Sequence, residues 1–383
     1  MSNTHALEQP RPFDRLPTEL LVKMLRHLPP PMVLLSDGDS PPYIENTLFA
    51  VSLVSRRFHA SNRNLMWQGL TIEAESTPAT LLQAIALVAK WPAIAQVGHE
   101  LRINELGDRP PRDWAVLLPS ADRLVARRFG PLELVDFACF HALRHLSLDD
   151  CAIDLSPPIT LPRLESLRLS YSAVTSAPPG ASSRAFPILR HLVLECTEGS
   201  GVSAVEPVFD NAFLAKLDSL EVAATAWHER ADDNLLPLED PPSSLPILWH
   251  NIVRVNDHLH DSDQALSTSS IPFGQHLLLR IFRWAEVGVP TSVGWERVCV
   301  EVRRVVALHK HARLRLVLVA GAPWPRPGAT PPELAALEAL EGDCQRRGVV
   351  LRSCEVPRVE DGPVPEFIEF LREEATRAAA EGA

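Results

Sequence analysis

The segment Leu143-Arg144-His145-Leu146-Ser147-Leu148 is the first clear copy of a six-residue phrase that recurs along the middle of the chain. Apolar residues stand at its first, fourth and sixth positions, and the last two alternate with polar residues, as in a short strand with one buried face. Further copies occupy residues 164–169 (LESLRL), 189–194 (LRHLVL) and 217–222 (LDSLEV), and residues 99–103 (HELRI) form a weaker earlier relative. The phrase therefore predicts a series of short strands.

The strands are expected to stack on one another in parallel. The four copies begin 21, 25 and 28 residues apart, and this spacing and the pattern L-x-x-L-x-L resemble leucine-rich repeats, whose period is roughly 20–29 residues. No single repeat can bury its own apolar face, so neighbours must stack into a curved solenoid. The asparagine typical of such repeats is missing, since Cys151, Ser172 and Cys196 or Thr197 stand near its place. The repeats are degenerate and their number stays open.

Polar positions between the leucines would line the concave face of such a solenoid. We expect this face to bind an unknown protein target, and the candidate target-binding residues are Arg144, Glu165, Arg168, Arg190 and Glu221.

The rest of the body is less regular. Residues 226–270 are rich in Asp, Pro and Ser, which predicts a loop or an irregular repeat. Residues 275–287 (QHLLLRIFRWAEV) have apolar residues at helical spacing, and residues 313–320 (RLRLVLVA) read as a buried strand. A helix over 332–347, a strand over 348–352 and a closing helix over 364–380 follow. The closing helix is expected to cover the end of the solenoid, with Phe367, Phe370 and Leu371 facing inward.

The N-terminal segment 13–28 (FDRLPTELLVKMLRHL) carries the clearest helical pattern. Pro17 suits the first turn of a helix, and Glu19 suits the positive end of the helix dipole. The apolar residues fall on one side of this helix, because positions four apart share a face. These residues are Leu16, Leu20, Leu21, Met24, Leu25 and Leu28. The core of a small helical bundle would by itself explain part of the stripe.

Residues 47–60 (TLFAVSLVSRRFHA) predict a second helix. Val51, Val54 and Phe58 line one face of it, and Asn46 stands where a helix cap is expected. Residues 64–70 follow, with Trp67 large enough to anchor the end of a small helical unit.

Three pieces in this order resemble the F-box family: LPxELL at 16–21, SLVSRRF at 52–58 and LMW at 65–67. The resemblance covers residues 13–70. It implies a small helical bundle that docks on the Skp-type adaptor of a cullin–RING ubiquitin ligase. An apolar helix face laid into a partner's groove is the physical basis of such docking. The implied docking residues are Leu16, Pro17, Leu20, Leu21, Met24, Leu25, Leu53, Val54 and Trp67.

The chain departs from the family between the first two pieces. The connection over residues 29–46, which includes SDGDSPP at 36–42, is longer than the usual link and is expected to be a solvent-exposed loop. If this insertion changes the angle between the helices, docking is weakened or lost. The alternative is then a leucine-rich-repeat interaction scaffold whose F-box-like module no longer docks.

Composition limits the other functions. The formal net charge is −11, so binding of nucleic acid through its phosphates is not expected. Neither a secretory signal nor a run of about 18 apolar residues is visible, so we expect no membrane span. The six cysteines lack Cys-x-x-Cys spacing, which is typical of free thiols in a reducing compartment, the cytoplasm or nucleus.

A search for catalytic groups favours no enzyme. The sequence contains no Gly-Lys pair and so no phosphate-binding loop of the G-x-x-x-x-G-K-[ST] type. His141 and His145 stand four apart, and residues 257–261 (DHLHD) are the densest ligand-like cluster, but a solvated strand and a solvated loop explain them better than a metal site. Cys139 and Cys151 bracket a histidine, yet buried cysteine is the commoner situation.

The sequence therefore predicts an α/β protein without a cofactor or metal. A small F-box-like helical module (13–70) precedes a degenerate leucine-rich-repeat-like solenoid with short parallel strands (71–383), irregular at 226–270. The expected function is a non-catalytic substrate-recognition adaptor whose partners are a Skp-type adaptor, cullin ligase subunits and a protein target. A hydrolase or transferase hidden in the C-terminal half, with a pocket around His258 and His260, is the hypothesis from a different class.

Overall fold

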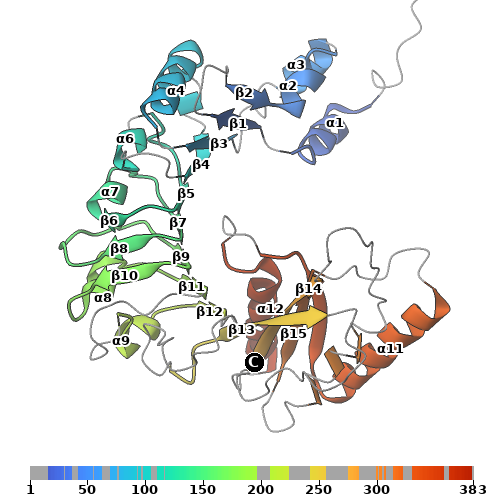
Figure 1. The fold of residues 1–383 in the computed structure, drawn as a ribbon. Helices are drawn as coiled ribbons and strands as arrows, with labels where there is room; N and C mark the ends of the chain where they lie inside the picture. Colours follow the sequence, from blue (N-terminus) through green and yellow to red (C-terminus); the bar gives the residue numbers. More distant parts are fainter. Residues whose placement is uncertain are drawn as a thin grey trace, which may run out of the picture. The chain divides into compact units, whose positions relative to one another are not determined.

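The computed structural model shows a mixed α/β protein with large, mostly parallel sheet structure (Figure 1). The described residues are 16–29, 31–36, 42–54, 56–62, 70–75, 77–92, 94–95, 98–104, 110–115, 117–195, 208–223, 242–255, 275–283, 299–300, 302–303, 306–307, 314–321, 330–357 and 362–381. They form two compact units, one of residues 1–129 and 135–144 and the other of residues 130–134 and 145–383. Each unit is described by itself.

The first unit contains a sheet with strand order β5-β4-β3-β1-β2. Pairing is parallel from β5 to β1, and β1 pairs antiparallel with β2. Its strands are β1 (Met32–Leu35), β2 (Tyr43–Glu45), β3 (Leu70–Glu75), β4 (Gly98–Asn104) and β5 (Arg123–Arg127). Its helices are α1 (Thr18–Leu25), α2 (Thr47–Ser52), α3 (Arg56–Asn62), α4 (Pro78–Lys90), α6 (Arg112–Ala115) and α7 (Val135–Ala138).

The link between α1 and α2 corrects the expectation of an open loop. Two segments of it, 32–35 and 43–45, form the hairpin β1–β2, and β1 also pairs with β3, so these segments belong to the sheet of the first unit. Residues 37–41, within the SDGDSPP stretch, lie outside the described residues. The cause lies in the alternation within β1, where Val33 and Leu35 are buried while Met32 and Leu34 are half-buried. The predicted helix over 47–60 is also two helices, α2 and α3, with a turn at Leu53 and Val54.

The second unit contains a parallel sheet with strand order β7-β9-β11-β12-β13-β14-β15-β16 and a smaller sheet β10-β8-β6. The large sheet comprises β7 (His145–Asp149), β9 (Ser166–Ser170), β11 (His191–Glu195), β12 (Ser219–Ala223), β13 (Ile247–Val255), β14 (His276–Arg283), β15 (Leu316–Ala320) and β16 (Val350–Cys354). The small one comprises β6 (Pro131–Glu133), β8 (Ala152–Asp154) and β10 (Ala173–Ser176). The helices are α8 (Ala181–Ala185), α9 (Asn211–Leu214), α11 (Pro331–Arg346) and α12 (Pro365–Glu381).

The recurring phrase forms the strands that the sequence predicts. Leu146 pairs with Leu167, Leu167 with Leu192 and Leu192 with Leu220, so equivalent leucines of successive copies stand side by side. All four are almost fully buried. The spacing of the phrase thus identified both the strands and their parallel register.

A second repeated feature follows the strands. Arg128, Asp150 and Tyr171 come directly after β5, β7 and β9, and all three have φ between 49° and 60°. This left-handed conformation turns the chain from each long strand into the short strand β6, β8 or β10, and it strains any residue other than glycine.

Replacing Asp150 by glycine should therefore stabilise the protein. The left-handed backbone costs an ordinary residue roughly 1 kcal/mol, although glycine also gains freedom in the unfolded chain. We expect a gain of up to about 1 kcal/mol in the free energy of unfolding, measured by urea denaturation. Asp149→Gly, next to it within β7, is the matched control and should destabilise. A loss of stability in Asp150→Gly would contradict this explanation of the turn.

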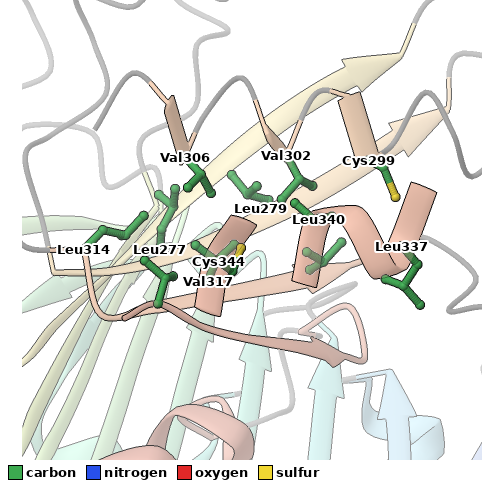
Figure 2. Packing of buried hydrophobic residues seen from close by; sticks show 12 residues of the cluster. Leu277, Leu279, Cys299, Val302, Val306, Leu314, Val317, Leu337, Leu340 and Cys344 are labelled. Carbon is green, nitrogen blue, oxygen red and sulfur yellow. The ribbon is translucent and has the colours of Figure 1, made fainter. Parts of the chain in front are cut away.

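The C-terminal strands are covered on both faces. Figure 2 shows Leu277 and Leu279 of β14 in a cluster with Val302, Val306 and residues of α11 such as Leu340. On the opposite face, the leucines of β13, β14 and β15 pack against Phe367 and Phe370 of α12. These leucines are Leu248, Leu278, Leu316 and Leu318.

Two predictions for this part of the chain are corrected. The predicted helix over 275–287 is the strand β14, because a strand buried on both faces has a continuous apolar run whose spacing also fits a helix. The closing helix, α12, packs on a face of the sheet and does not cover its end. Of the region 226–270, predicted as a loop or an irregular repeat, residues 247–255 form the strand β13, and most of the rest lies outside the described residues. The strands over 313–320 and 348–352 and the helices over 332–347 and 364–380 are confirmed as β15, β16, α11 and α12.

Candidate functional site

Helix α1 has two apolar sides. Pro17 is its N-cap residue, and the carbonyl oxygen of Pro17 accepts the first helical hydrogen bond, from Leu21 N–H at 3.1 Å. Leu21 and Leu25 are 1% and 3% exposed, whereas Leu20 and Met24 are 49% and 52% exposed. Because each pair is four residues apart, one apolar stripe faces the core and a neighbouring one faces solvent.

Helices α2 and α3 supply the core that the first stripe contacts. The side chain of Asn46 caps α2 by accepting a hydrogen bond from Phe49 N–H at 2.8 Å, as the sequence predicts. Leu48 joins Leu21 and Leu25 in a small buried cluster. The guanidinium of Arg57 on α3 donates to the carbonyl oxygen of Leu16 just before α1. The start of α1 is thereby tied to α3.

Helix α2 and the turn after it also expose apolar side chains to solvent. Phe49, Leu53 and Val54 are 41%, 71% and 59% exposed. Together with Leu20 and Met24 they form what we call the docking surface, a set of large apolar side chains on α1, on α2 and in the turn after it. Of the fourteen exposed large apolar side chains among the described residues, nine lie between residues 20 and 85. Such concentration is typical of a surface that another protein covers.

The nine docking residues implied by the resemblance therefore differ in their exposure to solvent. Pro17, Leu20, Met24, Leu53 and Val54 are exposed, and Leu16 is half-buried. The predicted docking role of Leu21 and Leu25 is wrong, because both side chains lie inside the small core of α1 and α2 and are not available to a partner. Trp67 lies outside the described residues.

The docking surface has basic residues near it. Lys23 on α1, Arg26 directly after α1 and Arg56 on α3 are exposed, and so are the acidic Glu19 and Glu45. This part of the chain thus carries a small positive excess, whereas the whole chain has a formal net charge of −11. A partner with acidic side chains around an apolar groove would complement it.

A buried polar network crosses the sheet of the second unit. Glu195 on β11 accepts hydrogen bonds from Arg168 on β9, at 2.6 Å, and from Arg280 on β14. Arg280 Nη2 lies 2.9 Å from His250 Nδ1, and His250 Nε2 lies 3.1 Å from Glu221 Oε2. Five strands, β9 and β11 to β14, are linked in this way.

The network ends on helix α12. The backbone N–H of Val364, the residue before α12, donates to Glu221 Oε1 at 2.7 Å. A carboxylate at the start of a helix is favoured by the helix dipole. Glu221 is therefore one of the groups that hold α12 against the sheet.

Hydrogen bonding assigns the protonation state of His250. Arginine can only donate, so Nδ1 of His250 accepts from Arg280 and Nε2–H donates to Glu221. Burial lowers the pKa of His250, which agrees with a neutral ring. Burial alone would raise the pKa of Glu195, but the charges of Arg280 and Arg168 lower it to about 2. Glu195 is therefore a carboxylate at neutral pH.

These findings correct the predicted target-binding face. Arg168 and Glu221 are 1% and 0% exposed and belong to the network, so they do not face a partner. Arg144 and Arg190 are exposed and Glu165 is half-buried. His250, Glu195 and Arg280 were missed by sequence reasoning: Glu195 lies on the face of β11 opposite Leu192 and Leu194, and no local pattern signals that its partners are on distant strands.

His276 links α12 to the sheet and makes stability depend on pH. Its Nδ1–H donates to the carbonyl oxygen of Ile247 at 3.1 Å, and its ring lies 5.2 Å from that of Phe367. Burial lowers the pKa of His276 from 6.5 to about 4. Below pH 6.5 the unfolded chain therefore binds a proton that the folded chain does not bind.

The stability contributed by neutral His276 is present above pH 6.5 and is lost as pH falls towards 4. We expect it to amount to about 3 kcal/mol, since each pKa unit corresponds to about 1.4 kcal/mol. Urea denaturation of wild type and His276→Asn between pH 7 and 4 measures this loss. The variant keeps a donor but does not titrate, so its stability should fall less. Parallel pH profiles of the two proteins would contradict the prediction.

The candidate catalytic and metal residues do not assemble a site within the described residues. No group of three or more His, Cys, Asp and Glu side chains there could hold a metal ion. His141 is exposed and His145 half-buried on β7. Burial raises the pKa of Cys299 and Cys354 to about 11 and about 12, the opposite of what activates a thiol nucleophile. Cys139 is exposed and Cys151 is buried, and both are free thiols.

The DHLHD cluster at 257–261, with its candidate residues His258 and His260, lies outside the described residues, as does Cys196. None of the helices in the described part of the chain combines the length and apolar character that crossing a membrane requires.

Comparisons of the chain with protein-family models, with curated proteins and with solved structures found no match.

Proposed function

We propose that this chain is the substrate-recognition adaptor of a cullin–RING ubiquitin ligase of the Skp–cullin–F-box type. Its F-box-like module, residues 13–70, docks on a Skp-type adaptor, and its body, a degenerate leucine-rich-repeat-like solenoid, binds a protein target. The observation that carries the proposal is the division of the N-terminal apolar residues. Leu21 and Leu25 complete the module's own core, while Leu20 and Met24 are left for a partner.

The mechanism is positional. Docking of the module and binding of a target by the body place lysines of the target near the ubiquitin-transferring subunits. This raises the effective concentration of the lysine amine without any chemistry on this chain. Work of this kind is done in the cytoplasm or nucleus, where ligase subunits and reduced cysteines are found together.

The proposed function requires this chain to bind a cullin subunit through a Skp-type adaptor, and this can be tested directly. The intact chain, immobilised, should retain a cullin subunit only when a Skp-type adaptor is also present. Retention of the adaptor and the cullin is read by immunoblot. Equal cullin recovery with and without the adaptor, or recovery of neither protein, would contradict the proposal.

A second candidate is a repeat scaffold whose F-box-like module no longer docks. The hairpin β1–β2 between α1 and α2 favours it, because pairing of β1 with β3 ties the module to the sheet. In that case the adaptor is not retained by the intact chain, and target binding by the body is independent of the ligase.

A further inference from the structure

The hairpin between α1 and α2 exposes apolar side chains of its own. Strand β1 buries Val33 and Leu35, whereas all three residues of β2 are exposed. Tyr43 and Ile44 are 60% and 38% exposed. Among the described strands of the first unit, β2 stands at the edge of the sheet. Edge strands are normally protected by charges, so two apolar residues there favour a surface that is covered in the working protein.

The hairpin is continuous with the docking surface. Only Asn46 separates β2 from α2, and the cap between Asn46 and Phe49 fixes the direction in which α2 starts. Within the 12 residues from 43 to 54, five large apolar side chains are exposed. They are Tyr43, Ile44, Phe49, Leu53 and Val54.

We propose that the hairpin extends the docking surface, so that the Skp-type adaptor covers Tyr43 and Ile44 together with Leu20, Met24 and Leu53. This inference rests on the proposed function. It gives the connection over residues 29–46 a role in docking. The scaffold alternative assumes instead that this connection abolishes docking. Tyr43 and Ile44 point to opposite faces of β2, so a partner that packs against the strand edge contacts both.

The charges near the docking surface indicate which kind of partner covers it. Lys23, Arg26 and Arg56 are exposed near the docking surface. A second copy of this chain would bring these three basic groups and only two acidic ones, Glu19 and Glu45, into a two-fold contact with an identical set, and the net like charge costs free energy. A partner with an apolar groove and acidic rim meets no such repulsion. An anionic membrane would also attract the basic groups, but membrane binding typically uses one long amphipathic helix rich in Lys and Arg, and α1 has 8 residues with Lys23 as its one cation.

The test compares matched variants of the intact chain. The hairpin variant is Tyr43→Asp/Ile44→Asp, and the control is Tyr171→Asp/Ile188→Asp, whose residues are 52% and 46% exposed in the second unit. The affinity for a purified Skp-type adaptor is measured by calorimetry. Light scattering and sedimentation with anionic vesicles are measured in parallel, and thermal unfolding checks the fold. A milder variant, Tyr43→Ser/Ile44→Thr, replaces the first if that one unfolds.

We expect the hairpin variant to bind the adaptor at least about tenfold more weakly than wild type and the control to bind normally. Unchanged affinity of the hairpin variant, while Leu20→Asp/Met24→Asp loses binding, would overturn this inference and leave the proposed function standing. Absence of binding by wild type would overturn both. Dimerisation or vesicle binding that requires Tyr43 and Ile44, without adaptor binding, would assign the surface to another occupant and also overturn the inference.

Discussion

Replacing Leu20 and Met24 together by aspartate should abolish adaptor binding while the protein stays folded. Both side chains are about half exposed in the free chain, so the change removes little of the core. In the proposed complex both are buried. Because docking buries only the exposed half of each side chain, loss of the two contacts removes about 1.5–3 kcal/mol of binding free energy, and each 1.4 kcal/mol corresponds to about tenfold in affinity. A loss of roughly 10- to 100-fold is expected from the lost contacts, and the cost of burying aspartate increases it further.

The control for this prediction is Ile188→Asp/Leu334→Asp, whose residues are 46% and 43% exposed in the second unit. It introduces the same charge on a comparable surface and should bind the adaptor as wild type does. Affinity is measured by calorimetry and folding by thermal denaturation. A folded Leu20→Asp/Met24→Asp protein that binds normally would show that the exposed stripe of α1 is not a docking surface.

Glu221→Ala should cause a large loss of stability in the second unit. Glu221 is fully buried and accepts hydrogen bonds from His250 and from the backbone of Val364. Alanine leaves both donors buried without an acceptor, and the charges of Arg168 and Arg280 then face Glu195 alone. Breaking a buried ionic network in this way typically costs about 3–5 kcal/mol.

Two measurements test the effect of Glu221→Ala. Urea denaturation should show the full loss for Glu221→Ala and almost none for Asp218→Ala, whose carboxylate is exposed and lies 3.8 Å from Arg190. Hydrogen exchange should show that the amides of α12 lose protection first, since Glu221 holds the start of that helix. Equal stability of the two variants would show that the network does not support the sheet.

Regular sequence patterns predicted the fold well where leucines alternate with other residues along a strand. The four copies from Leu143 to Val222 alternate between apolar and polar residues, and the structure confirms them as parallel strands in equivalent register. The same reasoning failed for β14, because Leu277, Leu278 and Leu279 are all apolar and all buried, so the sequence of this strand shows no period of two. Burial on both sides is a tertiary property, decided by α11 and α12.

The burial of the polar network residues could not be predicted from the local sequence either. Arg168 and Glu221 stand at positions that alternate with leucines, which predicts a solvated face. Their burial depends on Glu195, Arg280 and His250, and on α12, which come from distant parts of the chain. No local pattern signals such pairing. On α1, by contrast, the helical stripe was visible, but its division into a core pair and an exposed pair required the positions of Leu48 and its neighbours.

The most direct test of the central claim, that the N-terminal apolar residues are only half covered by their own fold, is a calorimetric titration of the intact chain with a purified Skp-type adaptor at several temperatures. We predict saturable binding of one adaptor per chain with a negative heat-capacity change, because apolar surface is buried on association. Absence of binding, or binding whose heat is independent of temperature, would contradict the claim.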